Sequence, residues 1–288
     1  MAEKLLKKCR VSEILNNTKL FNEWIKCLES EFNEIKTPMS VTRRTRLVMQ
    51  PYGRYVNKAD FKTICMGLGE EELCEEINVH PSLIGMAVDY LTRFILTKEL
   101  EESFSISLRG AIILGEREEA IELLKDIKGL DDKSIYNAIK ITGFDVVYRK
   151  GTLDYVPIET INPNNASVKN VRLLVERTVN FFKKYGPIIS YNVDFKGAYT
   201  NRVICGDCDF ITSDTLWDLK VLKKEINREH ILQILMYWRM GLRSNPKIFN
   251  KIKNIGIYNP RKNKVYLYSL KELNPTIIKI IDKYVIGY

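Results

Sequence analysis

The feature that most constrains the fold is a change in hydrophobic period near residue 187. Before that point apolar residues mostly recur at helical spacing, and after it they alternate with polar residues at the period of two typical of strands. The elements predicted after it are, in order, three strands (188–195, 202–212 and 215–222), an amphipathic helix (229–242), two strands (255–258 and 264–268) and a final helix from about residue 273. This order predicts a mixed α/β core.

Most of the earlier part of the chain is predicted to be helical. Residues 3–36 have apolar positions at helical spacing, and a strongly apolar helix is predicted after Pro81. We therefore expect an N-terminal, mainly helical and basic accessory region over residues 1–79. The principal domain is expected over residues 80–288, with a helical insertion at about 103–160.

The net charge of +9 is distributed unevenly along the 288 residues. Residues 61–134 have 8 basic and 16 acidic side chains (8 − 16 = −8), whereas residues 135–288 have 25 basic and 13 acidic ones (25 − 13 = +12). A basic half of this kind favours a polyanionic partner such as nucleic acid, with ordinary solvated faces as the alternative explanation. Because the sequence contains neither an apolar run of about 18 residues nor a secretion leader, we expect a cytoplasmic protein with no membrane partner.

The residues most suggestive of chemistry lie on the second and third predicted strands. Asp218 and Lys220 are two residues apart on a strand and therefore share a face, and a short turn would bring Asp209 beside Asp218. Two converging carboxylates repel one another unless a cation lies between them, and hard oxygen ligands suit Mg²⁺ or Mn²⁺. Lys220 would hold the attacking water or stabilise the charge that builds on phosphorus. The pattern predicts phosphodiester hydrolysis, and the alternative is a solvated strand edge carrying charges.

A second pair with the same spacing, Asp194 and Lys196, also lies on a predicted strand. No strand carboxylate arrives just before it and no helix follows it directly, so it is the weaker candidate. An arginine-rich segment with interleaved tyrosines is a different kind of signal, since arginine and aromatic side chains together can hold nucleic-acid strands. The possible DNA-binding residues there are Arg43, Arg44, Arg46 and Arg54, and the alternative is an ordinary loop with solvated arginines.

Three short motifs in this order resemble the RecB-like exonuclease branch of the PD-(D/E)XK nuclease superfamily. They are Gly-x-x-Asp, Asp-x-Lys on a strand, and Gln-x-x-x-Tyr on the following helix, and the matching residues are Gly206, Asp209, Asp218, Lys220, Gln233 and Tyr237. The resemblance covers about residues 80–270 and implies a restriction-endonuclease-like fold, in which a mixed sheet is flanked by helices.

The resemblance also implies a role for each matched residue. Asp209 and Asp218 would bind the metal ion together with the backbone carbonyl of Leu219, and Lys220 would be catalytic. Gln233 and Tyr237 would shape the site and contact the substrate, which we expect to be DNA, with RNA not excluded.

Members of this family often carry a further motif, Gly-x-x-x-His, on an earlier core helix. Gly85 and Asp89 have that spacing here, with Asp89 in the place of histidine, and an aspartate there would support a divalent ion. The alternative is that Asp89 pairs with Arg93 one helical turn away. Glu176 is the reserve candidate for this helix carboxylate.

Cysteine and histidine do not predict a second metal centre. Cys205 and Cys208 form a Cys-x-x-Cys, but no second pair with suitable spacing exists to complete a zinc site. Some RecB-like relatives hold an iron–sulfur cluster with cysteines near the C-terminus. None follows Cys208 here, so no such cluster is expected.

These observations predict a divalent-metal-dependent deoxyribonuclease acting in DNA processing, phage or mobile-element biology, or defence. The main alternative is a catalytically silent or partner-activated nucleic-acid-binding subunit on the same scaffold, within a larger complex. A hydrolase directed at RNA or at a small molecule through the same metal site is a further alternative.

Overall fold

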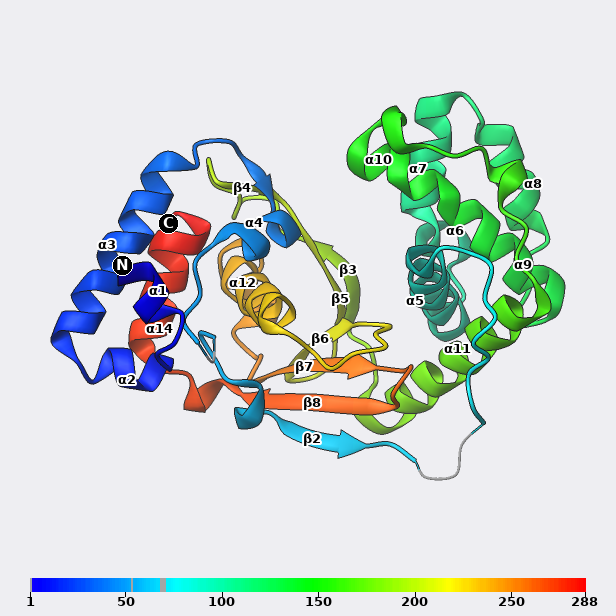
Figure 1. Cartoon of the computed structure of the whole chain (residues 1–288). Helices are drawn as coiled ribbons and strands as arrows, with labels where there is room; N and C mark the ends of the chain where they lie inside the picture. The colour runs from blue at the N-terminus through cyan, green and yellow to red at the C-terminus, as the bar shows by residue number, and fades with distance from the viewer. Residues whose placement is uncertain (1, 53, 68–70) are drawn as a thin grey trace. The chain divides into compact units, whose positions relative to one another are not determined.

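The computed structural model describes residues 2–52, 54–67 and 71–288 (Figure 1). The chain is divided into two compact units. Unit 1 comprises Met1–Cys65, Pro187–Tyr258 and Lys264–Tyr288, and unit 2 comprises Met66–Gly186 and Asn259–Asn263. The first 65 residues therefore belong to the same unit as the C-terminal strands, which differs from the predicted accessory region over 1–79. Residues 1, 53 and 68–70 of that region lie outside the described part of the chain.

Unit 1 is built on a mixed six-stranded sheet. Its strands, in spatial order, are β2 (Lys62–Cys65), β8 (Lys264–Ser269), β7 (Asn254–Asn259), β6 (Thr215–Leu219), β5 (Asp207–Ile211) and β3 (Ser190–Asp194). The pair β6·β7 is parallel, whereas β2·β8, β3·β5 and β5·β6 are antiparallel. A separate parallel pair is formed by β1 (Met39–Ser40) and β4 (Val203–Cys205).

The helices of unit 1 come from both ends of the chain. They are α1 (Ala2–Leu6), α2 (Val11–Leu15), α3 (Thr18–Glu34), α4 (Val41–Leu47), α12 (Arg228–Ser244), α13 (Pro246–Phe249) and α14 (Pro275–Ile280), with the short helices η1 (Lys58–Asp60), η5 (Leu270–Glu272) and η6 (Ile281–Ile286). The mixed α/β class is confirmed. The predicted order of strands, helix, two strands and helix is also present, but with four strands between residue 187 and α12 where three were predicted. The predicted helical stretch over 3–36 is confirmed as three successive helices.

Two strand predictions need correction. The single strand predicted over 202–212 is divided at Gly206 into β4 and β5, which belong to different sheets. At Gly206 the backbone approaches two side chains closely, since a Cβ there would lie 2.7 Å from Val41 Cγ2 and 3.2 Å from Tyr237 Cε1. Strand β2 was not predicted at all, because its four residues alternate too weakly between exposed and half-buried to give a periodic signal.

A buried arginine links the N-terminal helices to the end of the chain. Arg44 is 1% exposed, and its guanidinium donates to the carbonyl oxygens of Val285 (2.9 Å) and Tyr284 (2.6 Å) and to Glu31 (3.0 Å). All of these partners lie within unit 1, where Figure 1 shows α3 beside the C-terminal helices. The expectation that Arg44 contacts DNA is therefore wrong, because its donors are used inside the fold.

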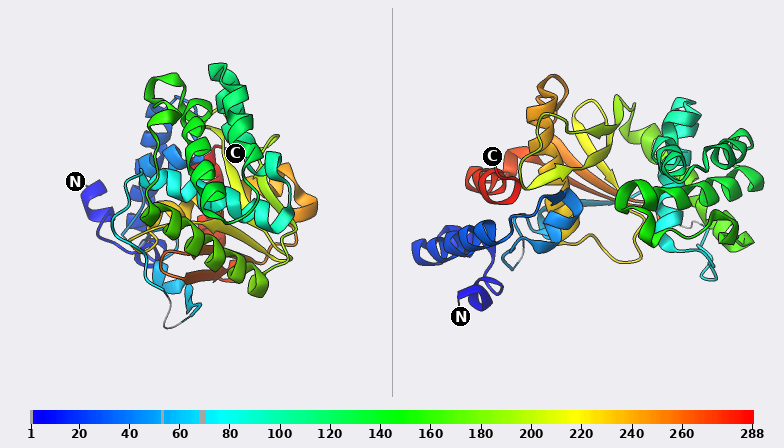
Figure 2. Two further views of the ribbon diagram at one scale, coloured as in Figure 1. Left: turned by 90° about the vertical axis from the view of Figure 1, so that its right-hand side faces the viewer. Right: turned by 90° about the horizontal axis from the view of Figure 1, so that it is seen from above.

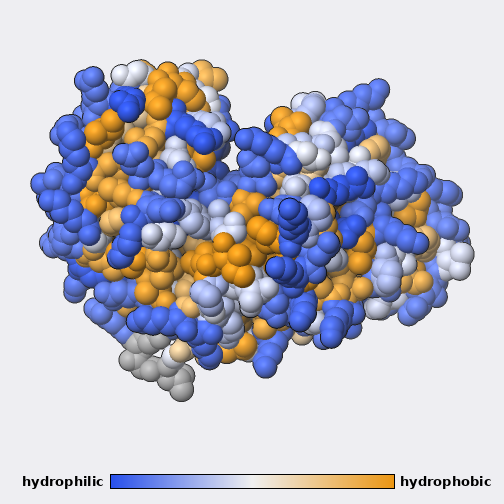
Figure 3. Space-filling view, turned by 180° about the vertical axis from the view of Figure 1, so that it is seen from behind, coloured by the Kyte–Doolittle hydropathy of each residue, from blue (hydrophilic) through white to orange (hydrophobic). Residues whose placement is uncertain are grey.

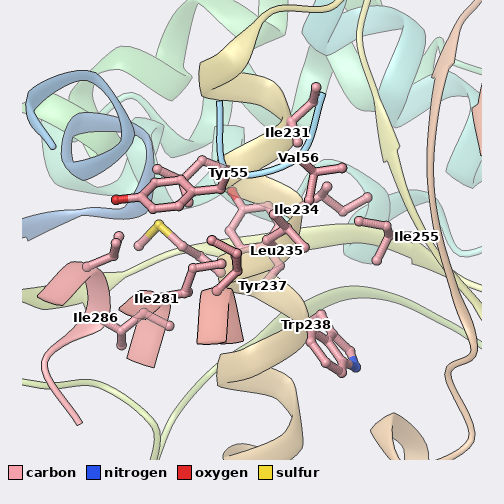
Figure 4. Packing of buried hydrophobic residues seen from close by; sticks show 14 of the residues in the cluster. Tyr55, Val56, Ile231, Ile234, Leu235, Tyr237, Trp238, Ile255, Ile281 and Ile286 are labelled. Carbon is pink, nitrogen blue, oxygen red and sulfur yellow. The ribbon is translucent and has the colours of Figure 1, made fainter. Parts of the chain in front are cut away.

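Helix α12 is the central helix of unit 1 and packs on strands β5 and β6. Most of its residues are buried on every side, and Figure 4 shows Ile231, Ile234 and Leu235 among side chains from other elements. Tyr55 and Val56, which precede η1, lie in this same hydrophobic cluster (Figure 4). The N-terminal segment therefore covers a face of α12 that would otherwise be exposed.

Unit 2 is helical (Figure 2). Its elements are α5 (Pro81–Thr97), α6 (Leu100–Ser103), α7 (Ser105–Leu114), α8 (Arg117–Lys125), α9 (Asp132–Ile141), α10 (Asp145–Lys150) and α11 (Asn165–Tyr185), with the short helices η2 (Thr142–Phe144), η3 (Thr152–Asp154) and η4 (Ile158–Thr160). The insertion expected at about 103–160 lies entirely inside this unit, which begins earlier and ends later.

The molecular surface is largely hydrophilic on the face shown in Figure 3, with apolar side chains in separate patches. Within residues 2–52, 54–67 and 71–288, no helix combines the length and the apolar character that crossing a membrane requires.

Glycine at position 256 gives Trp217 its space in the centre of the sheet. The two residues are partners in the parallel pair β6·β7, and a Cβ at Gly256 would lie 2.1 Å from Cζ3 of the indole ring. Trp217 is 2% exposed, and its indole N–H donates to Thr212 Oγ1 (3.0 Å). The ring is therefore buried, hydrogen-bonded and packed directly against the backbone at Gly256.

We predict that Gly256→Ala destabilises the protein by about 1–3 kcal/mol, because overpacking a filled core forces the indole or the backbone to shift. Urea unfolding monitored by far-ultraviolet circular dichroism, which reports on both units, measures the change. Gly85→Ala is the control, since a Cβ on that residue of α5 meets nothing within 4 Å. The control should be stabilised by about 0.5–1 kcal/mol, because alanine restricts the unfolded chain more than glycine does. Equal stability of Gly256→Ala and wild type would contradict the packing argument.

Candidate active site

Strands β5 and β6 bring two carboxylates together in the middle of the sheet. Their antiparallel register pairs Phe210 with Trp217, and continuing it by one residue sets Asp209 opposite Asp218. Asp209 Oδ2 accepts a hydrogen bond of 2.7 Å from the backbone amide of Leu219. The two aspartates predicted to converge are thus on the same face of neighbouring strands.

Asp218 and Lys220 share a face, as the two-residue spacing predicts. The Lys220 ammonium lies 3.0 Å from Oδ1 and 2.9 Å from Oδ2 of Asp218. The Asp218 side chain is only 2% exposed, because β6 lies between β5 and β7. The alternative of a solvated strand edge is therefore wrong, and Lys220, at 22% exposed, is more enclosed than a solvent-facing lysine.

Burial dominates the electrostatics of this centre. Burial raises the pKa of Asp218 to about 7, Lys220 opposes that shift, and the negative charges of Asp209 and Asp207 add to it. Burial alone would lower the pKa of Lys220, but the carboxylates of Asp218, Asp209 and Asp207 outweigh it, and the net shift is upward. Lys220 is therefore a firmly charged donor beside a carboxyl group that changes protonation state near neutral pH.

Asp207 is the acidic residue that the sequence analysis did not select. It lies two residues before Asp209 on β5, so that both side chains leave the strand on the same side. Its charge raises the pKa values of Asp218 and Lys220 and also that of Tyr237. The spacing of two that identified Asp218 and Lys220 would have identified Asp207 as well.

Gln233 and Tyr237 lie one turn apart on α12 and contact one another, as their spacing predicts. Gln233 Nε2 donates to the Tyr237 hydroxyl (2.7 Å) and to Thr42 Oγ1 on α4 (3.1 Å). Both side chains are almost completely buried, and the Tyr237 ring stacks on Phe195 at 5.3 Å. Gln233 and Tyr237 therefore form a rigid, buried pair close to the carboxylates. The hydrogen bond from Gln233 to Thr42 could not be predicted from the sequence.

The two candidate helix carboxylates, Asp89 and Glu176, both lie in unit 2. Asp89, on α5, accepts two hydrogen bonds from Arg93, at 3.0 Å from Nε and 2.6 Å from Nη2. Arg93 is 2% exposed, so the predicted alternative pairing is present and is largely buried rather than superficial. Glu176 is exposed on α11. The residues that the strands bring together are thus all from unit 1.

Of the remaining arginines, Arg43 and Arg46 are exposed on α4, and Arg46 lies 3.6 Å from Glu229. Arg54 is partly buried, and its Nη1 is fully enclosed without a hydrogen-bond partner among the described residues. Near it, burial and the charges of Lys220, Arg54 and Arg46 lower the pKa of His230 to about 4. The start of α12 is therefore a cationic region next to Lys220.

The chain's own groups fit a hard divalent cation at the strand carboxylates. Over residues 2–52, 54–67 and 71–288, no cluster of three or more His, Cys, Asp or Glu side chains has metal-binding geometry. Magnesium needs fewer, since it typically binds through one or two carboxylates and keeps water and substrate phosphate as its other ligands. Asp218 Oδ2 is buried and accepts no hydrogen bond of good geometry, and its one charged neighbour among the described contacts is the Lys220 ammonium at 2.9 Å.

Comparison with protein-family models, curated proteins and solved structures finds no match for this chain.

The imidazole of His230 also supports the beginning of α12. Its Nδ1 accepts a hydrogen bond from the backbone amide of Asn227 (3.2 Å), while Asn227 Oδ1 accepts from the amides of Glu229 and His230. This reciprocal capping needs a neutral ring, because a protonated Nδ1 no longer accepts.

We predict that acid weakens the fold partly through His230. The ring binds its proton near pH 6.5 in the unfolded chain but only near pH 4 in the folded one, so the unfolded state binds more protons between these values. The free energy of unfolding should therefore fall as the pH drops from 6.5 to 4. His230→Gln keeps the capping interaction and does not titrate, so its stability should fall less over the same range. Urea unfolding at pH 7, 6 and 5 tests this, and parallel curves for the two proteins would refute it.

Proposed function

We propose that this chain is a divalent-metal-dependent deoxyribonuclease of the RecB-like PD-(D/E)XK type, with the restriction-endonuclease-like fold of that superfamily. The observation that carries the proposal is the buried Asp218, whose carboxylate faces Lys220 at 2.9–3.0 Å beside Asp209. Ionised groups are rarely placed in the middle strands of a sheet unless a site requires them. Asp209 lies on β5, Asp218 on β6, and Gln233 and Tyr237 on α12, and this order of elements supports the proposal.

Each residue has a role in the proposed reaction. Asp209 and Asp218, with the carbonyl of Leu219, would hold Mg²⁺ or Mn²⁺, which polarises a phosphoryl oxygen and lowers the pKa of water. Lys220 donates hydrogen bonds from its positively charged ammonium and orients the attacking water or the phosphate oxygen. The Leu219 amide fixes the rotamer of Asp209, and Tyr237 with Gln233 fixes the wall behind the carboxylates.

We predict that Lys220→Ala lowers the rate of DNA cleavage on the order of 10²-fold or more, because a preorganised charged donor is removed. The assay uses linear, circular and single-stranded DNA with Mg²⁺, with Mn²⁺ and with chelator. Lys196→Ala is the matched control, since Lys196 has the same Asp-x-Lys spacing but is 86% exposed and lies 3.4 Å from Asp194.

The control should cleave like wild type, and thermal unfolding should show that both variants are folded. Metal-dependent cleavage that survives Lys220→Ala would contradict the proposed centre. Binding of DNA without cleavage by wild type under every metal condition would support the silent or partner-activated scaffold instead.

We predict that metal binding is pH-dependent in a definite direction. Asp218 has a pKa of about 7 without a metal, and it must lose its proton to act as a ligand. Below pH 7 the apparent affinity for Mg²⁺ should therefore fall by about tenfold for each pH unit. Calorimetric titration of Mg²⁺, from roughly one and a half pH units below this pKa to about one unit above it, measures the change in affinity. An affinity that does not change across this range would exclude Asp218 as the titrating ligand.

A further inference from the structure

Arg54 has an unfavourable backbone conformation and an enclosed side-chain nitrogen without a partner among the described residues. Its backbone φ is +75°, a region that side chains other than glycine rarely adopt. Its Nη1 is enclosed, and it has no hydrogen-bond or ion-pair partner among residues 2–52, 54–67 and 71–288. Strained residues persist where the surrounding structure fixes them, and they cluster at binding sites.

The neighbouring residues fix where Arg54 lies. Tyr55 and Val56 follow it directly, are 2% and 4% exposed, and pack in one cluster with Ile231 and Ile234 of α12 (Figure 4). Arg54 is thereby anchored beside the first turns of this helix. The helix begins at Arg228 and, two residues later, presents His230, on which the charges of both Arg54 and Lys220 act.

The charges around Arg54 are of its own sign. Arg228 is exposed at the start of α12 and repels Arg54, and Arg46 lies nearby with the single carboxylate of Glu229 at 3.6 Å. The amides of the first helical turn are already occupied by Asn227 Oδ1, at 2.9 and 3.1 Å. The guanidinium groups are therefore the available donors of this region.

A phosphate group is the ligand that matches these donors. Guanidinium is planar, permanently charged and able to bind phosphate through two parallel hydrogen bonds, and it tolerates partial burial better than an ammonium group. A phosphate would also relieve the repulsion between Arg54 and Arg228.

We propose that Arg54, together with Arg228, binds a phosphate group of the substrate strand other than the one that is cleaved. This inference rests on the proposed function, because it assigns a second contact to the strand held at Asp209, Asp218 and Lys220. The contact sets the distance between the bound phosphate and the cleaved bond, and it makes the start of α12 a determinant of substrate choice.

The test is equilibrium binding of a fluorescent single-stranded oligonucleotide in EDTA, measured by anisotropy from low to high salt. Arg54→Met should weaken binding about fivefold at 0.1 M salt and reduce the salt dependence by the slope of about one phosphate contact. Lys253→Met is the control for charge alone. Lys253 is exposed, and its amide bonds Asp214 at the opposite end of β6 from Lys220. The Lys253→Met variant should bind the oligonucleotide like wild type.

Two further readouts separate binding from structure and define the phosphate. Arg54→Met should not lower the melting temperature, because the side chain has no hydrogen-bond partner to lose among the described residues. A lowered melting temperature would show a structural role and overturn the proposal. A greater loss for a 5′-phosphorylated than for a 5′-hydroxyl oligonucleotide assigns the site to a terminal phosphate, and an equal loss assigns it to an internal one.

Unchanged affinity and salt slope in Arg54→Met, or an equal loss in Lys253→Met, would overturn the inference. Because the assay needs no cleavage, its failure is distinct from failure of the nuclease assignment. DNA cleavage together with binding that does not depend on Arg54 would support the proposed function and contradict the phosphate site. Binding that depends on Arg54, without cleavage under any metal condition, would support the phosphate site and contradict the proposed function.

Discussion

The ion pair between Asp218 and Lys220 is the constraint on which the rest of unit 1 depends. A carboxylate that is 2% exposed in an interior strand is unfavourable unless a cation compensates it, and the spacing of two along β6 supplies that cation directly. The pair does not satisfy the site completely, because Asp218 Oδ2 accepts no hydrogen bond of good geometry and Asp209 and Asp207 add negative charge nearby. The excess of negative charge is the electrostatic condition that a bound cation would relieve.

The packing around this pair fixes the two strands that carry it. Trp217, the residue before Asp218, fills the space left by Gly256 on β7, which favours the observed register of the two strands. Just before the next strand, β5, Gly206 lets the backbone pass close to Val41 and Tyr237, three residues before Asp209. Both glycines are required because of close approach to a large side chain. The positions of Asp209 and Asp218 are thus supported by apolar contacts of the neighbouring residues.

The alternation of residues along β5 and β6 predicted extended chain there, the shared face of Asp218 and Lys220, and the approach of Asp209, but not the break at Gly206 that separates β4 from β5. It was also sufficient to place Gln233 and Tyr237 together on a helix, because such patterns are local. Arg44 could not be predicted in the same way. Three arginines lie within four residues of α4, and only Arg44 among them is buried. It is buried because its guanidinium donates to the carbonyl oxygens of Tyr284 and Val285, about 240 positions further along the chain. Strand β2 was missed because four residues without alternation carry no periodic signal.

The first 65 residues are better regarded as part of unit 1 than as an accessory to it. Thr42 hydrogen-bonds Gln233, Arg44 ties α4 to the C-terminal helices, and Tyr55 and Val56 cover α12. An ionised centre inside a sheet lowers stability, and the hydrophobic cluster around α12 has to offset that cost. Part of that cover is contributed by Tyr55 and Val56, which lie far before the helix in the sequence. The same segment carries Arg54 to the start of α12, so the contacts that stabilise the centre also determine which charges surround it.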